Sequence, residues 1–261
     1  MELSLKGKRA IVCGSTQGIG KASAIELAAL GAHVTLVSRD EKKLKNVLAE
    51  LSSGQGQQHS YLVADFNIPD QLKIEVEKYV NKEAVHILVN NTGGPPGGPA
   101  LTASPDEFVR AFSNHLLCNQ ILVQAVVPGM KQGGFGRIVN IISTSVKIPI
   151  RGLGVSNTIR GAVANWSKTL SLELGPFGIT VNNVLPGAAM TSRLEAIIRD
   201  RAEKQKKTID EVTKEMVAEI PAGRISSASE VAAAIAFLCT PAAGYINGIN
   251  LPVDGGRTGS L

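Results

Sequence analysis

Residues 13–20 read Cys13-Gly14-Ser15-Thr16-Gln17-Gly18-Ile19-Gly20 and stand between a short apolar run and the first helical pattern of the chain. Glycines at positions 14, 18 and 20 permit a tight turn in which backbone N–H groups come close to a diphosphate. The partial positive charge at the start of the following helix also favours an anion. A glycine-rich turn at such a junction predicts a dinucleotide site formed by Gly14, Ser15, Thr16, Gln17, Gly18, Ile19 and Gly20.

Short apolar runs and amphipathic helical patterns alternate along the rest of the chain. Strands are predicted at Ala10–Cys13, His33–Val37, Tyr61–Ala64, Ile87–Val89, Ile138–Ile142, Ile179–Leu185 and Ile249–Val253. This alternation predicts an α/β fold, a Rossmann-like, doubly wound parallel sheet of about seven strands covered by helices in three α/β/α layers. No linker divides the 261 residues, so we expect a single domain over residues 1–261.

One region, residues 188–223, contains no strand candidate and reads as a long polar helical stretch. An insertion after the carboxyl end of a strand suits a substrate lid, whereas the alternative is a peripheral helix pair without mobility. Capping-box spacing, with Glu three residues after Ser or Thr, predicts helices that begin after Ser104, Thr208 and Ser227.

Composition excludes several classes of protein. With 44% hydrophobic residues the chain is not disordered, and no apolar stretch reaches the ~18 residues of a membrane span. We see no secretory signal at Met1–Arg9, and Cys13, Cys118 and Cys239 suggest neither disulfides nor a metal site, so a cytoplasmic location is expected. The net charge of +5 is spread along the chain, which argues against a nucleic-acid partner.

The second predicted strand ends in Ser38-Arg39-Asp40. An acidic side chain near this position holds the ribose 2′-hydroxyl of NAD, whereas an arginine accommodates the 2′-phosphate of NADP. Ser38 and Arg39 therefore favour NADP, with NAD as the alternative, and Asp40 is interpreted as the N-cap of the next helix.

The spacing Gly-x3-Gly-x-Gly, Asn90-Asn91-Thr92-Gly93, Asn182–Gly187 and Val253-Asp254-Gly255-Gly256 occur in the order typical of one family. From about Leu5 to Gly256 the chain resembles the short-chain dehydrogenase/reductases, and within them the bacterial 3-oxoacyl-acyl-carrier-protein reductases. The resemblance implies further cofactor contacts from Asp65, Phe66, Asn90, Asn91, Gly93, Pro186, Gly187 and Ala189. It also implies a homo-oligomer, dimer or tetramer, acting on a small-molecule substrate.

The family uses a catalytic tetrad of Asn, Ser, Tyr and Lys, with the last two spaced Tyr-x3-Lys on one helix. Ser143 matches the catalytic serine, but Ser156 and Arg160 stand where the resemblance places Tyr and Lys. His115 aligns with the tetrad Asn, and Asn114 lies one residue early. The resemblance implies that Arg160 would also contact the nicotinamide ribose.

These differences weaken one chemical step, the transfer of a proton to the substrate oxygen. A serine is shorter and far less acidic than a tyrosine, and an arginine does not deprotonate in proteins. Three interpretations stay open: an NADP(H)-dependent oxidoreductase of a carbonyl or secondary alcohol with an altered proton path, an NADP-binding regulatory protein without catalysis, or a site for non-redox chemistry. In the first, which we favour, His115 is the substitute donor because an ordinary histidine pKa of about 6.5 suits the task. For His115 itself we favour the interpretation that it fills a polar gap in a helix. For Ser143 and Ser145 the alternative is that they are satisfied hydroxyls at the end of a strand.

Overall fold

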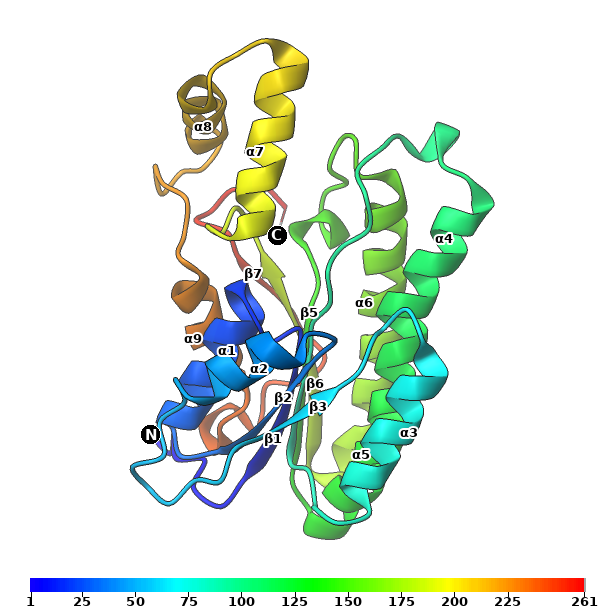
Figure 1. Cartoon of the computed structure of the whole chain (residues 1–261), viewed down its shortest axis with the longest axis vertical. Coiled ribbons are helices and arrows are strands. Elements are labelled where there is room, and N and C mark those ends of the chain that lie inside the picture. The colour runs from blue at the N-terminus through cyan, green and yellow to red at the C-terminus, as the bar shows by residue number, and fades with distance from the viewer. Residues whose placement is uncertain (261) are drawn as a thin grey trace.

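The computed structural model describes residues 1–260 as a sheet of seven parallel strands in the order β3-β2-β1-β4-β5-β6-β7 (Figure 1). The strands are β1 (Arg9–Cys13), β2 (His33–Ser38), β3 (Ser60–Val63), β4 (Ile87–Asn90), β5 (Gly136–Ile141), β6 (Ile179–Pro186) and β7 (Asn250–Val253). All seven predicted strands are confirmed, with ends that differ by no more than two residues. The Rossmann-like fold class is confirmed with them.

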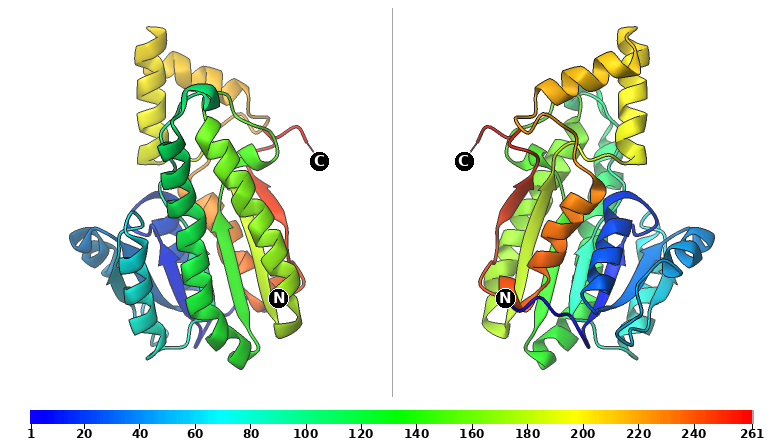
Figure 2. Two further views of the ribbon diagram at one scale, coloured as in Figure 1. Left: turned by 90° about the vertical axis from the view of Figure 1, so that its right-hand side faces the viewer. Right: turned by 90° about the vertical axis from the view of Figure 1, so that its left-hand side faces the viewer.

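Helices cover both faces of the sheet: Figure 1 shows the three layers edge-on, and Figure 2 shows the helices of each outer layer in front of the sheet. One face carries α1 (Gly18–Ala29), α2 (Glu41–Leu48) and α9 (Ala228–Leu238), and the other carries α3 (Pro69–Val80), α4 (Pro105–Phe112), α5 (Cys118–Gly133) and α6 (Gly154–Leu174). Side chains of β1 alternate between the layers, because Val12 packs in the core with α1 and α9 while Ile11 packs in the core with α3 and α5. A strand buried on both faces is apolar throughout, which explains why the sequence pattern was readable.

The predicted helix starts are also confirmed. Ser104, Thr208 and Ser227 each accept a hydrogen bond from the backbone N–H of a glutamate three residues on, and that glutamate accepts one from the backbone N–H of the capping residue. Asp40 caps α2 by accepting from Lys43 N at 3.0 Å, as expected.

Two helices, α7 (Ser192–Gln205) and α8 (Ile209–Ala218), stand beyond the carboxyl edge of the sheet (Figures 1 and 2). They enclose a small core of their own, formed by Ala188, Ile198, Ala202, Val212, Met216 and Ile220. The predicted polar helical stretch is therefore confirmed as a pair of helices. That this pair acts as a mobile substrate lid stays a prediction. No helix within residues 1–260 is long and apolar enough to cross a membrane.

Candidate functional site

The strand order reverses between β1 and β4, so the chain segments that follow these strands diverge and leave a crevice at the carboxyl edge of the sheet. The glycine-rich turn lies here. Gly14 and Gly18 have φ values of +58° and +56°, a region that side-chain-bearing residues rarely adopt. A Cβ on Gly20 would overlap the carbonyl oxygen of Gly14 and lie 2.6 Å from Asn91 Nδ2. The turn therefore has no space for side chains on its inner side.

The turn offers unpaired backbone donors. Gln17, at the N-cap of α1, is extended and its side chain caps nothing, so within residues 1–260 the N–H groups that open α1 have no partner. Asn91 supports the turn from β4 by donating from Nδ2 to Gly14 O at 3.3 Å. The Ser15 hydroxyl faces β2, where it accepts from Val37 N at 3.1 Å. A close glycine turn with free amides at a helix N-terminus fits the diphosphate of a dinucleotide.

The end of β2 bears on the choice of coenzyme. Asp40 is occupied as the cap of α2, and the hydrogen bond from Lys43 N lowers the pKa of its carboxyl. Arg39 is exposed and forms no hydrogen bond or ion pair within the described part of the chain. The residues at this position therefore suit a 2′-phosphate better than a free 2′-hydroxyl.

The other predicted cofactor residues lie on the segments that leave β3, β4 and β6. Asp65 accepts from Asn67 N at 2.9 Å, and the backbone oxygen of the buried Phe66 accepts from Cys118 Sγ. Gly187 N donates to Val253 O at 3.0 Å, and Ala189 pairs with Ser226. These bonds place the segments along one edge of the sheet.

A buried row of asparagines runs across four strands just behind this edge. Asn90, Asn140, Asn183 and Asn250 occupy paired register positions on β4, β5, β6 and β7. Asn90 Nδ2 donates to Asn140 Oδ1 at 2.8 Å, Asn140 Nδ2 to Asn183 Oδ1 at 3.0 Å, and Asn183 Nδ2 to Asn250 Oδ1 at 2.8 Å. We call these four residues the asparagine ladder. The ladder was not predicted from the sequence, where its signal was at least one asparagine in each of the four strands.

Ser143 follows β5, which brings it to the same edge. Its Oγ accepts from Ser145 N at 3.1 Å, which leaves its own O–H free to donate. The Ser145 hydroxyl is buried and has no hydrogen-bond partner among the described residues, which does not support the alternative in which it is a satisfied hydroxyl.

Ser156 and Arg160 share one face of α6, and both are buried. Arg160 Nη1 donates to Ile141 O at 3.2 Å, and no carboxylate within residues 1–260 pairs with this guanidinium. Burial, and next the positive charge of Arg193, lower the pKa of Arg160 to about 10. Arg160 therefore remains a buried, uncompensated cation at neutral pH.

His115 lies on a single π-helical turn, Ser113–Leu117, between α4 and α5. Such turns occur frequently at functional sites. Burial, followed by the charges of Arg160 and Arg193, lowers the pKa of His115 to about 2, and its Nδ1 is buried and has no partner within residues 1–260. The expectation of an ordinary pKa near 6.5 is therefore wrong, because the ring stays neutral at physiological pH. Asn114 turns away and donates to Asn67 Oδ1 at 2.9 Å.

Arg193, in the first turn of α7, was not predicted as a site residue from the sequence. Its Nη1 donates to Gly94 O at 2.9 Å and its Nη2 to Pro95 O at 3.1 Å, which clasps the helix pair to the loop after β4. Thr191, the N-cap of α7, covers the glycine turn, since a Cβ on Gly18 would lie 3.1 Å from its Cγ2. The signal for Arg193 in the sequence was weak, because it is a single arginine in a segment without acidic residues.

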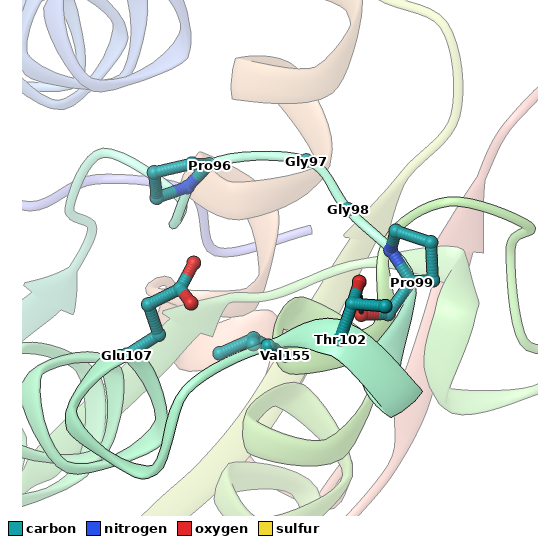
Figure 3. Close-up of a pocket in the computed structure, with 8 residues that line it drawn as sticks. Pro96, Gly97, Gly98, Pro99, Thr102, Glu107 and Val155 are labelled. Atoms are coloured by element: carbon teal, nitrogen blue, oxygen red, sulfur yellow. Dashed lines mark hydrogen bonds between the residues drawn. The ribbon is translucent and has the colours of Figure 1, made fainter.

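A cavity of about 180 Å³ lies beside that loop (Figure 3). It is bounded by the loop, by α4 and by the first turn of α6, and its lining comprises Pro96, Gly97, Gly98, Pro99, Thr102, Ala103, Glu107 and Val155. Gly98 N donates to Gly152 O at 2.7 Å and Gly98 O accepts from Gly154 N at 2.9 Å, so the loop is joined to the start of α6. The loop therefore lies beside the start of the helix that carries Ser156 and Arg160.

Comparison with known proteins agrees with this geometry. The family model described as enoyl-(acyl carrier protein) reductase matches residues 14–258. The 3-oxoacyl-[acyl-carrier-protein] reductase FabG of Haemophilus influenzae is 32% identical over 254 residues, which covers 97% of this chain and 98% of that protein. The chain belongs to the short-chain dehydrogenase/reductase family.

Solved structures extend the similarity of this short-chain dehydrogenase/reductase to the whole fold. The L-sorbose reductase of Gluconobacter frateurii, complexed with NADPH and L-sorbose, superposes with a TM-score of 0.93 at 27% identity, with 100% of both chains covered. A putative NAD(P)-dependent gluconate 5-dehydrogenase of Beutenbergia cavernae with bound NADP gives a TM-score of 0.90 at 30% identity, again over 100% of both chains.

Proposed function

We propose that the protein is an NADP(H)-dependent oxidoreductase that interconverts a carbonyl and a secondary alcohol by an altered proton path. The observation that carries the coenzyme assignment is the glycine turn, in which Gly14, Gly18 and Gly20 leave room for a diphosphate against free backbone amides. Arg39 supports NADP over NAD, and the two solved relatives described above hold NADPH and NADP. When bound, NADPH supplies a hydride to the carbonyl carbon of the substrate.

The residues around the substrate oxygen stabilise the negative charge that develops on it. The oxygen gains negative charge as the carbonyl is reduced. Ser143 donates a hydrogen bond to it, since its Oγ is already anchored as an acceptor by Ser145 N. Arg160, in the position where the family's lysine is predicted, stabilises the alkoxide with a buried positive charge, which is worth more than the same charge in water.

The proton itself reaches the alkoxide through water. The hydroxyl of Ser156 has no hydrogen-bond partner within the described residues. It holds that water near the substrate oxygen, in the space that the family's tyrosine side chain would fill. His115 does not act as an imidazolium acid, because it is neutral, and it serves as a neutral hydrogen-bonding group. Loss of a general acid costs about 10²–10⁴-fold in rate, so we expect slow but real turnover.

The test is calorimetric titration of NADPH followed by NADPH oxidation against ketones, 3-oxoacyl thioesters and quinones. We expect micromolar or tighter binding and turnover of at least one carbonyl class. Binding without turnover across the panel would favour an NADP-binding protein without catalysis. Failure to bind either coenzyme would contradict the proposal.

We further propose that the chain forms a homodimer or tetramer. Val109, Phe112 and Leu117 expose apolar side chains along α4 and the π-helical turn, and Leu172 does so on α6. Burial of these side chains against a second copy would stabilise the assembly. Light scattering is expected to give at least twice the mass of the 27.4 kDa chain, and a monomer at tens of micromolar would contradict this.

A further inference from the structure

The segments that border the crevice contain basic residues but no acidic ones. Three segments follow the carboxyl ends of β4, β5 and β6, namely residues 91–103, 142–160 and 186–194. They contain three arginines (Arg151, Arg160 and Arg193) and none of the 22 Asp and Glu residues of the chain. On most protein surfaces the two signs are interspersed, so a cluster of one sign marks attraction for the opposite charge.

Two of these cations are held at the ends of neighbouring strands, because Arg160 Nη1 donates to Ile141 O at the end of β5 and Arg193 Nη1 donates to Gly94 O after β4, the strand paired with β5. Arg160 is 8% exposed and no carboxylate pairs with it within residues 1–260. A buried charge without a counter-ion is costly, which favours a ligand that supplies one. Arg193 lies at the exposed rim, where its two bonds to Gly94 O and Pro95 O leave other N–H groups of the guanidinium unused.

The acidic side chains in neighbouring segments are already occupied. Glu107, which lines the adjacent cavity, accepts from Ser104 N at 2.8 Å and from Ser104 Oγ at 3.2 Å. Asp254, beside Gly187, accepts from Gly256 N at 3.0 Å and from Thr258 N at 2.8 Å. Neither carboxylate forms an ion pair with Arg160 or Arg193 within residues 1–260.

We infer that the substrate is an oxo acid or hydroxy acid, whose carboxylate binds between Arg193 and Arg160 while its carbonyl lies at Ser143. This inference rests on the proposed function and names its substrate class. The group that the two arginines would recognise is an oxyanion. It could come from the substrate carboxylate or from the diphosphate of the coenzyme, and the experiment below distinguishes the two. Hydrogen bonds between charged partners are worth about 1.5–3 kcal/mol, so loss of one arginine is expected to weaken anion binding by about 10–100-fold.

The experiment compares oxamate with its neutral analogue oxamide by calorimetry on the protein saturated with NADPH. We expect oxamate to bind at least tenfold more tightly than oxamide, Arg193→Gln to abolish that preference, and Arg193→Lys to retain most of it. The matched control is Arg199→Gln, which removes the same charge from an exposed site on α7 where the side chain pairs with Glu195. That variant should bind oxamate normally.

Two results would overturn the inference. One is equal or undetectable binding of oxamate and oxamide. The other is an Arg193→Gln variant that loses affinity for NADPH itself while the oxamate preference survives, which would assign the arginine to the coenzyme diphosphate. Because binding is measured without turnover, an inactive protein that still prefers oxamate would refute the oxidoreductase proposal alone. Conversely, turnover of neutral ketones in preference to oxo acids would refute only the substrate class.

Discussion

Gly20 is the residue at which the smallest addition should have the largest effect on coenzyme binding. A Cβ there would overlap Gly14 O and crowd Asn91 Nδ2, so Gly20→Ala must open the turn. We expect the affinity for NADPH to fall at least tenfold, measured by fluorescence titration. Gly129→Ala in α5 is the control, because a Cβ there meets nothing within 4 Å. Unchanged affinity in Gly20→Ala would remove the turn from the binding site.

Arg39 gives a second test at the same scale. Its side chain is exposed and has no partner in the described chain, so Arg39→Gln should leave folding unchanged. A charged hydrogen bond to phosphate is worth about 1.5–3 kcal/mol, and we therefore expect the ratio of NADPH to NADH affinity to fall about 10–100-fold. Lys42→Gln, also exposed and nearby in sequence, serves as the control. If the ratio of NADPH to NADH affinity does not change, groups other than Arg39 determine the coenzyme preference.

Much of the site was predictable residue by residue, because its signals are local. The glycine spacing, the serine after β5 and the changed pair Ser156 and Arg160 are all readable from short segments. The neutral state of His115 was not predictable, because it depends on burial and on Arg193, which is distant in sequence.

Among the elements, the sheet holds the feature that local patterns could not show. Each strand was recognised by its own apolar run, but the asparagine ladder depends on the register between strands, such as Asn90 opposite Asn140. Register is a property of the folded sheet, and no short window of sequence contains it. The hydrogen bonds from Arg193 to Gly94 and Pro95 were not predicted because these residues lie nearly 100 positions apart in the sequence.

The ladder should stabilise the carboxyl half of the sheet. Asn183 accepts from Asn140 Nδ2 and from Ser167 Oγ and donates to Asn250 Oδ1, all in buried or half-buried surroundings. Asn183→Ala leaves these partners unpaired, at a cost of about 1–3 kcal/mol for each buried group. We expect Tm to fall by more than about 5 °C. Asn165→Ala, exposed on α6, should shift Tm by less than about 2 °C, and equal shifts in the two variants would argue that the ladder adds no stability.

For the whole molecule, histidine burial predicts loss of stability in weak acid. The pKa of His115 is lowered to about 2, whereas the unfolded chain titrates near the ordinary value of about 6.5. Between these values the unfolded state binds a proton that the native state does not, so stability falls as pH falls below about 6.5, by about 1 kcal/mol at pH 5.5. His86, whose pKa is also lowered by burial, contributes in the same direction.

Thermal unfolding at pH 7.5 and 5.5 measures this dependence. The drop in Tm should be smaller in His115→Gln than in the parent, whatever the absolute Tm of the variant. Identical drops would show that the ring is not held neutral in the folded protein.

The position of Thr191 has a kinetic consequence. Its methyl group lies over Gly18, and Thr191 is also the N-cap of α7. The segment from Pro186 to Thr191 therefore connects the residue that covers the glycine-rich turn to the helix pair α7 and α8. We infer that Thr191 in this position hinders a nucleotide from leaving the turn, whereas a product at Ser143 does not have to pass Thr191. We therefore expect compulsory order, with NADPH the first reactant on and NADP⁺ the last product off. Product-inhibition patterns should then show NADP⁺ competing with NADPH alone, and a random-order pattern would mean that Thr191 moves away from the turn independently of the substrate.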